Sequence, residues 1–253
     1  MRRAIGVIPA RWGSSRFPGK PLCMIAGKPL LQHVWEACCR AKALDQLIIA
    51  TDDFRILEAA FDWGAEVAMT WPKHSSGTDR IAEVVAKVKQ ARHIINIQGD
   101  EPLIDPKLID RLVRELERDA KLEMITAAHP FGSAAEAASP HQVKVVVNKA
   151  SEALYFSRSQ IPYPSNSSEP YRYLRHQGVY GYKRELLLRF VRWKPSLLER
   201  VERLEQLRAL ENGVRIKVVM TGSGSPGVDT LEDVGLIARL LGARGKRFRK
   251  SLR

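Results

Sequence analysis

The stretch AIGVIPARWGSSRFPGK, residues 4–20, decides the fold of this chain. Its first six residues form a short apolar run, which is typical of a buried β-strand. The run leads directly into a loop that holds Arg11, Arg16 and Lys20, and two glycines let the loop backbone approach a ligand closely. Guanidinium and ammonium groups spread along such a loop can neutralise several phosphate oxygens at once. We therefore expect a strand that ends in a triphosphate-binding loop.

This loop differs from the two common phosphate-binding motifs. It contains neither Gly-x-x-x-x-Gly-Lys-Ser/Thr nor Gly-x-Gly-x-x-Gly. The competing interpretation is an ordinary solvated turn between a strand and a helix, because basic loops are common on protein surfaces. Taken alone, the loop leaves both interpretations open.

Apolar runs and segments of helical period alternate through the first half of the chain. The predicted strands cover residues 4–9, 47–51, 66–69, 94–98 and 124–129, and the predicted helices cover residues 30–43, 54–63, 78–88 and 108–119. This alternation indicates β-α-β units and a Rossmann-like α/β fold with a mainly parallel central sheet. Ligands of such sheets bind beyond the carboxyl ends of the strands, where the first basic loop, Asp52 and Asp100 are expected to meet.

The pattern changes after Pro130. Strands are predicted over 143–147, 153–156 and 178–182 without intervening helices, so we expect a smaller antiparallel insertion over 130–182. A strand over 214–220 and a closing helix over 231–241 complete one domain, residues 1–241. The basic C-terminal tail, residues 242–253, is expected to be frayed and solvated.

Composition indicates a globular protein of the cytoplasm. The chain has 253 residues and 45% hydrophobic content, enough for one large core without disulfide support. Its three cysteines match neither a disulfide framework nor zinc-ligand spacing. The N-terminus leads straight into the first strand, and no apolar run reaches the ~18 residues of a membrane span, so we expect neither export nor insertion.

The net charge of +13 raises the alternative of a nucleic-acid-binding protein. Seven basic and no acidic residues lie from Arg239 onward, so about half of the excess belongs to the tail. The chain also lacks interleaved aromatic and basic residues and any familiar nucleic-acid-binding module. The remaining charge suits acidic small-molecule substrates, and we expect no specific nucleic-acid partner.

Asp100 and Asp229 are the candidate ligands of a metal ion. Asp100 follows a predicted strand through a single glycine, and Asp229 follows a glycine-rich turn that can bring it to the same edge of the sheet. Mg²⁺ usually takes one or two carboxylates together with phosphate oxygens and water. Each residue also has a structural alternative, because Asp100 could close a turn and Asp229 could cap the last helix.

Ten segments in the same order resemble those of the sugar-activating cytidylyltransferases, specifically the 3-deoxy-manno-octulosonate (Kdo) cytidylyltransferases, or CMP-Kdo synthetases. The segments are PAR (9–11), SRFPGKPL (15–22), GKPL (27–30), HSSGTDR (74–80), NIQGDEP (96–102), VKVV (143–146), ALYFSR (153–158), LRHQGVYGY (174–182), LEQLR (204–208) and GVDT (227–230). The resemblance extends from about residue 4 to about residue 241. It implies an enzyme that joins CTP to Kdo to give CMP-Kdo and pyrophosphate, for lipopolysaccharide biosynthesis, and that forms a homodimer through residues 130–182. A cytidylyltransferase for sialic acid or amino-substituted Kdo is the nearer alternative.

The resemblance also implies roles for individual residues. Arg11, Lys20, Asp100 and Asp229 would be catalytic, with Mg²⁺ as the cofactor at the two aspartates. Arg11, Arg16, Lys20, Ser76, Gly77 and Arg80 would bind the nucleotide. Gln98, Arg158, His176, Tyr180, Glu205 and Gln206 would bind the sugar. Because Glu205 and Gln206 are adjacent in a predicted helix, at most one of them is expected to point straight into the pocket. Arg175 is expected at the surface.

Overall fold

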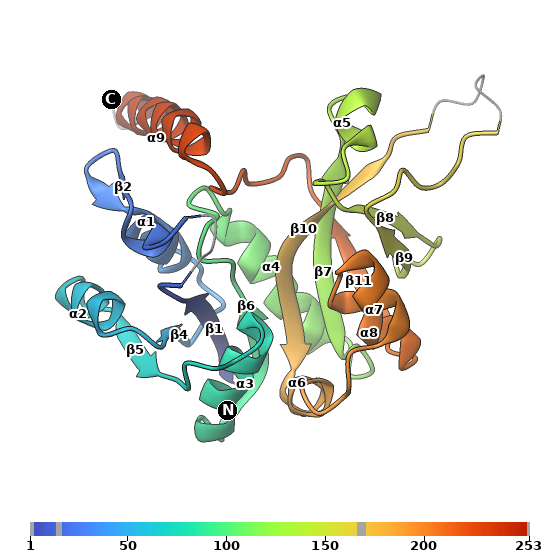
Figure 1. Cartoon of the computed structure of the whole chain (residues 1–253), viewed down its shortest axis with the longest axis horizontal. Helices are drawn as coiled ribbons and strands as arrows, with labels where there is room; N and C mark the ends of the chain where they lie inside the picture. Colours follow the sequence, from blue (N-terminus) through green and yellow to red (C-terminus); the bar gives the residue numbers. More distant parts are fainter. Residues whose placement is uncertain (1–2, 14–16, 166–170, 252–253) are drawn as a thin grey trace.

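A central β-sheet with helices on both faces forms the body of the protein (Figure 1). The computed structural model describes residues 3–13, 17–165 and 171–251. Its strands are β1 (Arg3–Ala10), β2 (Met24–Ile25), β3 (Lys28–Pro29), β4 (Gln46–Thr51), β5 (Glu66–Met69), β6 (Ala91–Asn96), β7 (Met124–Pro130), β8 (Lys144–Val147), β9 (Ala153–Ser157), β10 (Leu174–Lys183) and β11 (Ile216–Met220).

The helices follow the strands in the order expected of β-α-β units in the first half of the chain. They are the short 3₁₀ helix η1 (Lys20–Leu22) and the α-helices α1 (Leu30–Cys38), α2 (Phe54–Asp62), α3 (Gly77–Lys87), α4 (Pro106–Arg118), α5 (Ala134–Ala138), α6 (Arg184–Phe190), α7 (Leu197–Glu202), α8 (Gln206–Glu211) and α9 (Leu231–Ser251). The expected strands and long helices are all present, with ends shifted by a few residues.

The main path of the sheet has the order β11-β7-β10-β6-β1-β4-β5. Strand β1 pairs in parallel with β4 and with β6, and β4 pairs in parallel with β5. The chain thus leaves β1 toward one edge and then returns to its other side, so the topology switches direction between β1 and β6. Sheets of this kind bind ligands at such a switch point, beyond the carboxyl ends of the strands.

The segment expected to form an antiparallel insertion is part of this sheet rather than a separate unit. Strand β8 pairs antiparallel with both β9 and β10, as the predicted antiparallel arrangement requires. However, β10 also pairs antiparallel with both β6 and β7 and lies between them. The last strand of the predicted insertion, β10, is therefore also a strand of the central sheet.

Alternate residues of β1 build the two sides of the core. Ile5 and Val7 pack in a cluster with α3, α6 and α8, whereas Ala4 and Ile8 pack in a second cluster with α1, α2 and α4. All four side chains are buried. A strand covered on both faces needs apolar residues at every position, which explains the continuous apolar run at the start of the sequence.

Side-chain caps start several helices where the sequence predicts them. Asp53 caps α2 by accepting from the main-chain N–H of Arg55 at 3.0 Å. Asp105 caps α4 in the same way, with Pro106 in the first turn. Each cap satisfies a helix N–H that would otherwise lack a partner and contributes about 1 kcal/mol.

The closing helix continues further than the sequence predicts. It was expected to end at Leu241 with a frayed tail, but α9 extends to Ser251. The chain beyond Gly242 contains Ala, Arg and Lys, which favour helix, and no proline. The described apolar side chains of α9 that pack on the body are Val234, Ile237, Ala238 and Leu241, against a cluster that includes Ile25 and Leu30.

We expect the deletion of residues 243–253 to leave the thermal midpoint nearly unchanged, because the described apolar contacts of α9 with the body all precede Gly242. Circular dichroism melting of the shortened protein measures this. A deletion of residues 231–253 is the matched control, and it should lower the midpoint because it exposes Ile25 and Leu30. A large loss of stability in the shorter deletion would show that the end of α9 packs on the body.

In the described ranges, none of the helices combines the length and the apolar composition that a membrane span requires.

Candidate active site

A cavity of about 330 Å³ opens at the switch point between β1 and β6. Its walls come from the chain after β1, the chain after β6, the N-terminus of α3 and the loop before α9. The lining residues are Pro9, Ala10, Arg11, Lys20, Pro21, His74, Ser75, Ser76, Gly77, Arg80, Gln98, Gly99, Asp100 and Asp229. Eight residues singled out in the sequence therefore meet here, as the strand ends predict.

Two glycines allow close backbone approaches beside the cavity. A Cβ atom on Gly99 would lie 3.0 Å from the carbonyl oxygen of Pro9. Gly19 has a φ of 72°, in the left-handed region, and starts η1, which holds Lys20. These two positions bring the basic loop and the Asp100 loop together. Arg16, the remaining cation predicted in the basic loop, lies outside the described residues.

Lys20 joins the two candidate metal ligands. Its Nζ donates to Asp100 Oδ2 at 2.6 Å and to the carbonyl oxygen of Val228 at 2.8 Å, and it lies 3.5 Å from Asp229 Oδ1. The Asp233 carboxylate of α9 accepts from the main-chain N–H groups of Asp229 and Thr230, both at 2.8 Å, and so holds the chain just before the helix. The Asp100 and Asp229 carboxylates thus lie on either side of one ammonium group.

The donor set of this cluster fits magnesium. The Asp100 and Asp229 carboxylates both face the position of the Lys20 ammonium, which neutralises their charge. Both aspartates line the cavity. No group of three or more histidine, cysteine, aspartate or glutamate side chains that could hold a metal occurs in the described ranges. Two hard oxygen donors beside an anion-binding loop suit an ion that takes its remaining ligands from phosphates and water.

The N-terminus of α3 forms part of the cavity wall through Ser76 and Gly77. Ser76 caps the helix by accepting from the N–H of Asp79 at 3.1 Å, and Asp79 accepts in return from the N–H of Ser76 at 3.1 Å. The loop before it is held by Glu83, which accepts from Trp71 N at 2.8 Å and lies 2.7 Å from His74 Nε2. Gly77 and Ser76 are therefore presented on a fixed turn.

Arg80 is buried, and its side chain is held by two residues that the sequence did not single out for this role. Its Nη2 donates to Asp52 Oδ2 at 3.0 Å, and its Nη1 donates to Thr70 Oγ1. Asp52 follows β4 and Thr70 follows β5, so the carboxyl ends of two strands orient this guanidinium. Asp52 was expected at this edge of the sheet, but its partner emerges only from the tertiary fold.

The residues predicted to bind the sugar come from four places: the chain after β6, the chain after β9, strand β10 and the start of α8. Gln98 lines the cavity and donates through Nε2 to the carbonyl oxygen of Gly178 at 2.9 Å. His176 and Tyr180 lie on β10, and the His176 ring packs between Phe156 and Tyr180. The Tyr180 hydroxyl is buried and has no hydrogen-bond partner among the described residues. Such an orphaned hydroxyl suits a site that a polar ligand completes.

Glu205 and Gln206 lie near this region, whereas Arg158 does not approach the cavity. Glu205 Oε2 accepts from Thr78 Oγ1 at 2.5 Å, and Gln206 begins α8 and is buried. Arg158 donates through Nε to the carbonyl oxygen of Glu202 at 2.8 Å and through Nη1 to that of Pro140 at 3.2 Å. The structure thus connects Glu205 to α3 and holds Arg158, just after β9, against Glu202 and Pro140.

Arg175, which directly precedes His176 in β10, was expected at the surface. Its side chain is half-buried, and burial lowers its pKa.

We expect His176 to make stability depend on pH. Burial lowers its pKa to about 3, far below the ~6.5 of an unfolded histidine. As the pH falls below about 6.5, His176 binds a proton in the unfolded chain but stays neutral in the folded chain. The free energy of unfolding therefore decreases between about pH 6.5 and pH 3. Between pH 7 and pH 5 the free energy of unfolding should fall about 1 kcal/mol more in the wild type than in His176→Gln, since the ring keeps some contact with water.

Urea titrations at the two pH values measure this difference. His141→Gln is the control, because His141 is exposed, and it should follow the wild type. Equal pH dependence in the wild type and His176→Gln would contradict the prediction.

The mostly parallel sheet, the cavity at its switch point and the cation between two carboxylates define an α/β nucleotidyltransferase. The chain belongs to the cytidylyltransferase family, whose model, described as "Cytidylyltransferase", matches residues 5–216.

Two curated relatives are named 3-deoxy-manno-octulosonate cytidylyltransferase. The one from Solibacter usitatus is 50% identical over 242 residues, with 96% of each chain covered. The one from Escherichia coli is 47% identical over 230 residues, which cover 91% of this chain and 92% of the relative. The match thus extends through nearly all of both chains.

Two solved structures resemble the fold. One, described as CMP:2-keto-3-deoxy-manno-octonic acid synthetase complexed with CTP, superposes with a TM-score of 0.92 and 44% identity, covering 96% of this chain and 99% of that one. A 4-diphosphocytidyl-2C-methyl-D-erythritol synthase from Anaerococcus prevotii has a TM-score of 0.64 at 12% identity, with 95% and 99% covered, and it shares the fold alone.

Proposed function

We propose that this chain transfers the CMP group of CTP to Kdo, with release of pyrophosphate. One observation carries the proposal: Lys20, Asp100, Asp229 and the capped N-terminus of α3 meet in a single cavity of a chain about half identical to Kdo cytidylyltransferases. The same residues lie in the segments by which the sequence resembles that family. From the resemblance to that family, we propose that the product serves lipopolysaccharide biosynthesis.

The nucleotide binds across the switch point. Arg11 and Lys20, with Arg16 of the same loop, hold the phosphates and stabilise the departing pyrophosphate. The main-chain N–H of Gly77, in the first turn of α3, faces the cytosine carbonyl, and Arg80 contacts the same edge. Because Asp52 and Thr70 already orient Arg80, little side-chain freedom is lost when the base binds.

Asp100 and Asp229 would hold Mg²⁺ beside the phosphates of CTP. When bound, this ion polarises the α-phosphate and neutralises charge that develops in the transition state. The anomeric hydroxyl of Kdo attacks the α-phosphorus in line, a new phosphorus–oxygen bond forms, and the bond to pyrophosphate breaks. The chain itself supplies positioning and fixed charges, and no covalent intermediate with the protein is required.

The sugar binds between Gln98 and the buried end of β10. Tyr180 offers an unpartnered hydroxyl to the hydroxyls of Kdo, and His176, whose Nε2 lies 2.9 Å from Thr126 Oγ1, offers its other ring nitrogen. Glu205 and Gln206 close the pocket from the start of α8. Arg158 remains a proposed partner of the sugar carboxylate. We also propose a homodimer formed through residues 130–182 and a cytoplasmic location.

A pyrophosphate-release assay with CTP and Mg²⁺ tests the proposed function. Kdo should support turnover at a kcat/KM far above those of sialic acid and amino-substituted Kdo, and mass spectrometry should identify CMP-Kdo as the product. UTP in place of CTP is the control for base selection. Turnover with another sugar and none with Kdo would overturn the proposal.

A further inference from the structure

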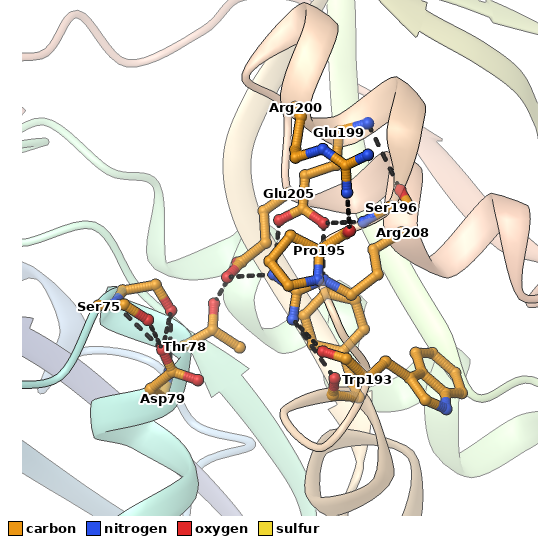
Figure 2. Close-up of polar contacts among 12 residues, drawn as sticks. Ser75, Thr78, Asp79, Trp193, Pro195, Ser196, Glu199, Arg200, Glu205 and Arg208 are labelled. Carbon is orange, nitrogen blue, oxygen red and sulfur yellow. Dashed lines mark hydrogen bonds and ion pairs between the residues drawn. The ribbon is translucent and has the colours of Figure 1, made fainter.

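Thr78 connects the two halves of the proposed site. It is the second residue of α3, directly after Ser76 and Gly77 of the cavity, and its side chain is 3% exposed. Its Oγ1 donates to Glu205 Oε2 at 2.5 Å, although the two residues are 127 positions apart in the sequence. Figure 2 shows this contact as the link between the start of α3 and the α7–α8 region. Thr78 itself does not line the nucleotide cavity.

The α7–α8 region holds Glu205 from the opposite side. Arg208 donates to both carboxylate oxygens of Glu199, at 2.7 and 2.5 Å, and to the carbonyl oxygen of Trp193 at 3.3 Å (Figure 2). This bidentate pair fixes the guanidinium, whose Nη2 lies 3.8 Å from Glu205 Oε1. Glu205 therefore lies between a fixed cation and the Thr78 hydroxyl, one at each carboxylate oxygen.

The surroundings of Glu205 oppose its ionisation except at these contacts. Burial raises the pKa of Glu205, and the Asp79 carboxylate of α3 raises it further. Hydrogen bonds from Thr78 and Ser76 and the charge of Arg208 lower it. On β10, Tyr180 and Tyr182 also face this carboxylate. The Thr78 hydroxyl is thus one of few groups that favour the charged carboxylate.

The position of Glu205 matters because the unpaired hydroxyl of Tyr180 faces its carboxylate. The Tyr180 Oη is buried and lacks a hydrogen-bond partner among the described residues. A ligand with several hydroxyls could donate to Glu205 and also contact Tyr180. We propose that Thr78 is a positioning residue for the acceptor sugar, acting through its hydrogen bond to Glu205. This inference rests on the proposed function, since it concerns the second substrate of that reaction.

Thr78→Val tests the inference, because valine keeps the shape and removes the hydroxyl. The KM for Kdo should rise roughly tenfold, while the KM for CTP changes less than about twofold. The acidic limb of kcat/KM for Kdo should move to higher pH, because the charged carboxylate has lost a donor. Thr78→Ser should restore both values.

Thr221→Val is the matched control, because the Thr221 hydroxyl bonds to Gln177 and lines a separate cavity. It should leave both KM values unchanged. Equal increases of both KM values in Thr78→Val, or a Thr78→Ser protein as defective as Thr78→Val, would overturn the proposal.

A second measurement does not depend on turnover. Carbon-13 NMR of protein labelled at glutamate carboxyls follows the titration of Glu205, with Glu205→Gln to assign its signal. The apparent pKa should rise in Thr78→Val and return in Thr78→Ser, and an unchanged titration would overturn the role of Thr78. If the wild type makes no CMP-Kdo, the proposed function fails, whereas this titration still decides whether the Thr78 hydroxyl stabilises the charged form of Glu205.

Discussion

Asp100→Asn and Asp229→Asn are each expected to lower kcat by a factor on the order of 10²–10³, with little change in thermal stability. An amide keeps the size of the side chain but loses the charge that binds a divalent cation. Asp229 is 71% exposed and has only a 3.5 Å ion pair with Lys20, so the folded state loses little when its charge is removed. Pyrophosphate release at saturating CTP and Kdo, together with thermal melting, measures both effects.

Asp105→Asn is the matched control for these substitutions. Asp105 is exposed and caps α4, a role that asparagine performs equally well, so both turnover and melting should stay unchanged. Addition of EDTA to the wild type should also abolish turnover. Full activity of the wild type in EDTA would remove the basis for the metal, and a destabilised Asp229→Asn protein with near-normal kcat would indicate a structural role.

Lys20→Met is expected to lower kcat/KM for CTP on the order of a hundredfold. Lys20 is the cation that joins the basic loop to Asp100 at 2.6 Å and to the Val228 carbonyl at 2.8 Å. Its removal takes a positive charge from the phosphate side of the cavity and releases the loop before α9. Methionine keeps the length of the stem, so the change is mainly electrostatic.

Lys28→Met provides the comparison, because Lys28 pairs with Glu36 at 2.6 Å outside the cavity and its side chain is 44% exposed. A surface pair of this kind contributes about 0–1 kcal/mol, so its loss should leave kcat/KM for CTP unchanged. Equal effects of the two substitutions would show that Lys20 acts through general charge rather than at the phosphates.

Much of the nucleotide-binding part of the site could be predicted, because each of its features depends on residues that are close together in the sequence. The apolar run of β1, the basic loop after it and the Ser76 cap each depend on residues adjacent in sequence. Parallel strands bring their carboxyl ends to one edge, so Arg11 and Asp100 were expected to meet, and both line the cavity.

The proposed sugar-binding part of the site depends on the pairing of strands that are far apart in the sequence. Strand β10 lies between β6 and β7, although the pattern of its residues resembles that of a separate antiparallel unit. An apolar strand pattern does not specify its neighbour, because many strands present compatible faces. The placement of His176 and Tyr180 beside Gln98 follows from that pairing alone.

The sequence by itself determined the alternation of strands and helices, the helix caps and the position of the charged loops at the strand ends. These features arise from periodicity and from hydrogen bonds over a few residues. The tertiary structure alone decided that Asp52 holds Arg80, that Lys20 lies between Asp100 and Asp229, and that Thr78 contacts Glu205. Buried polar groups require partners, and which partner each one meets depends on how the whole sheet folds rather than on any local pattern.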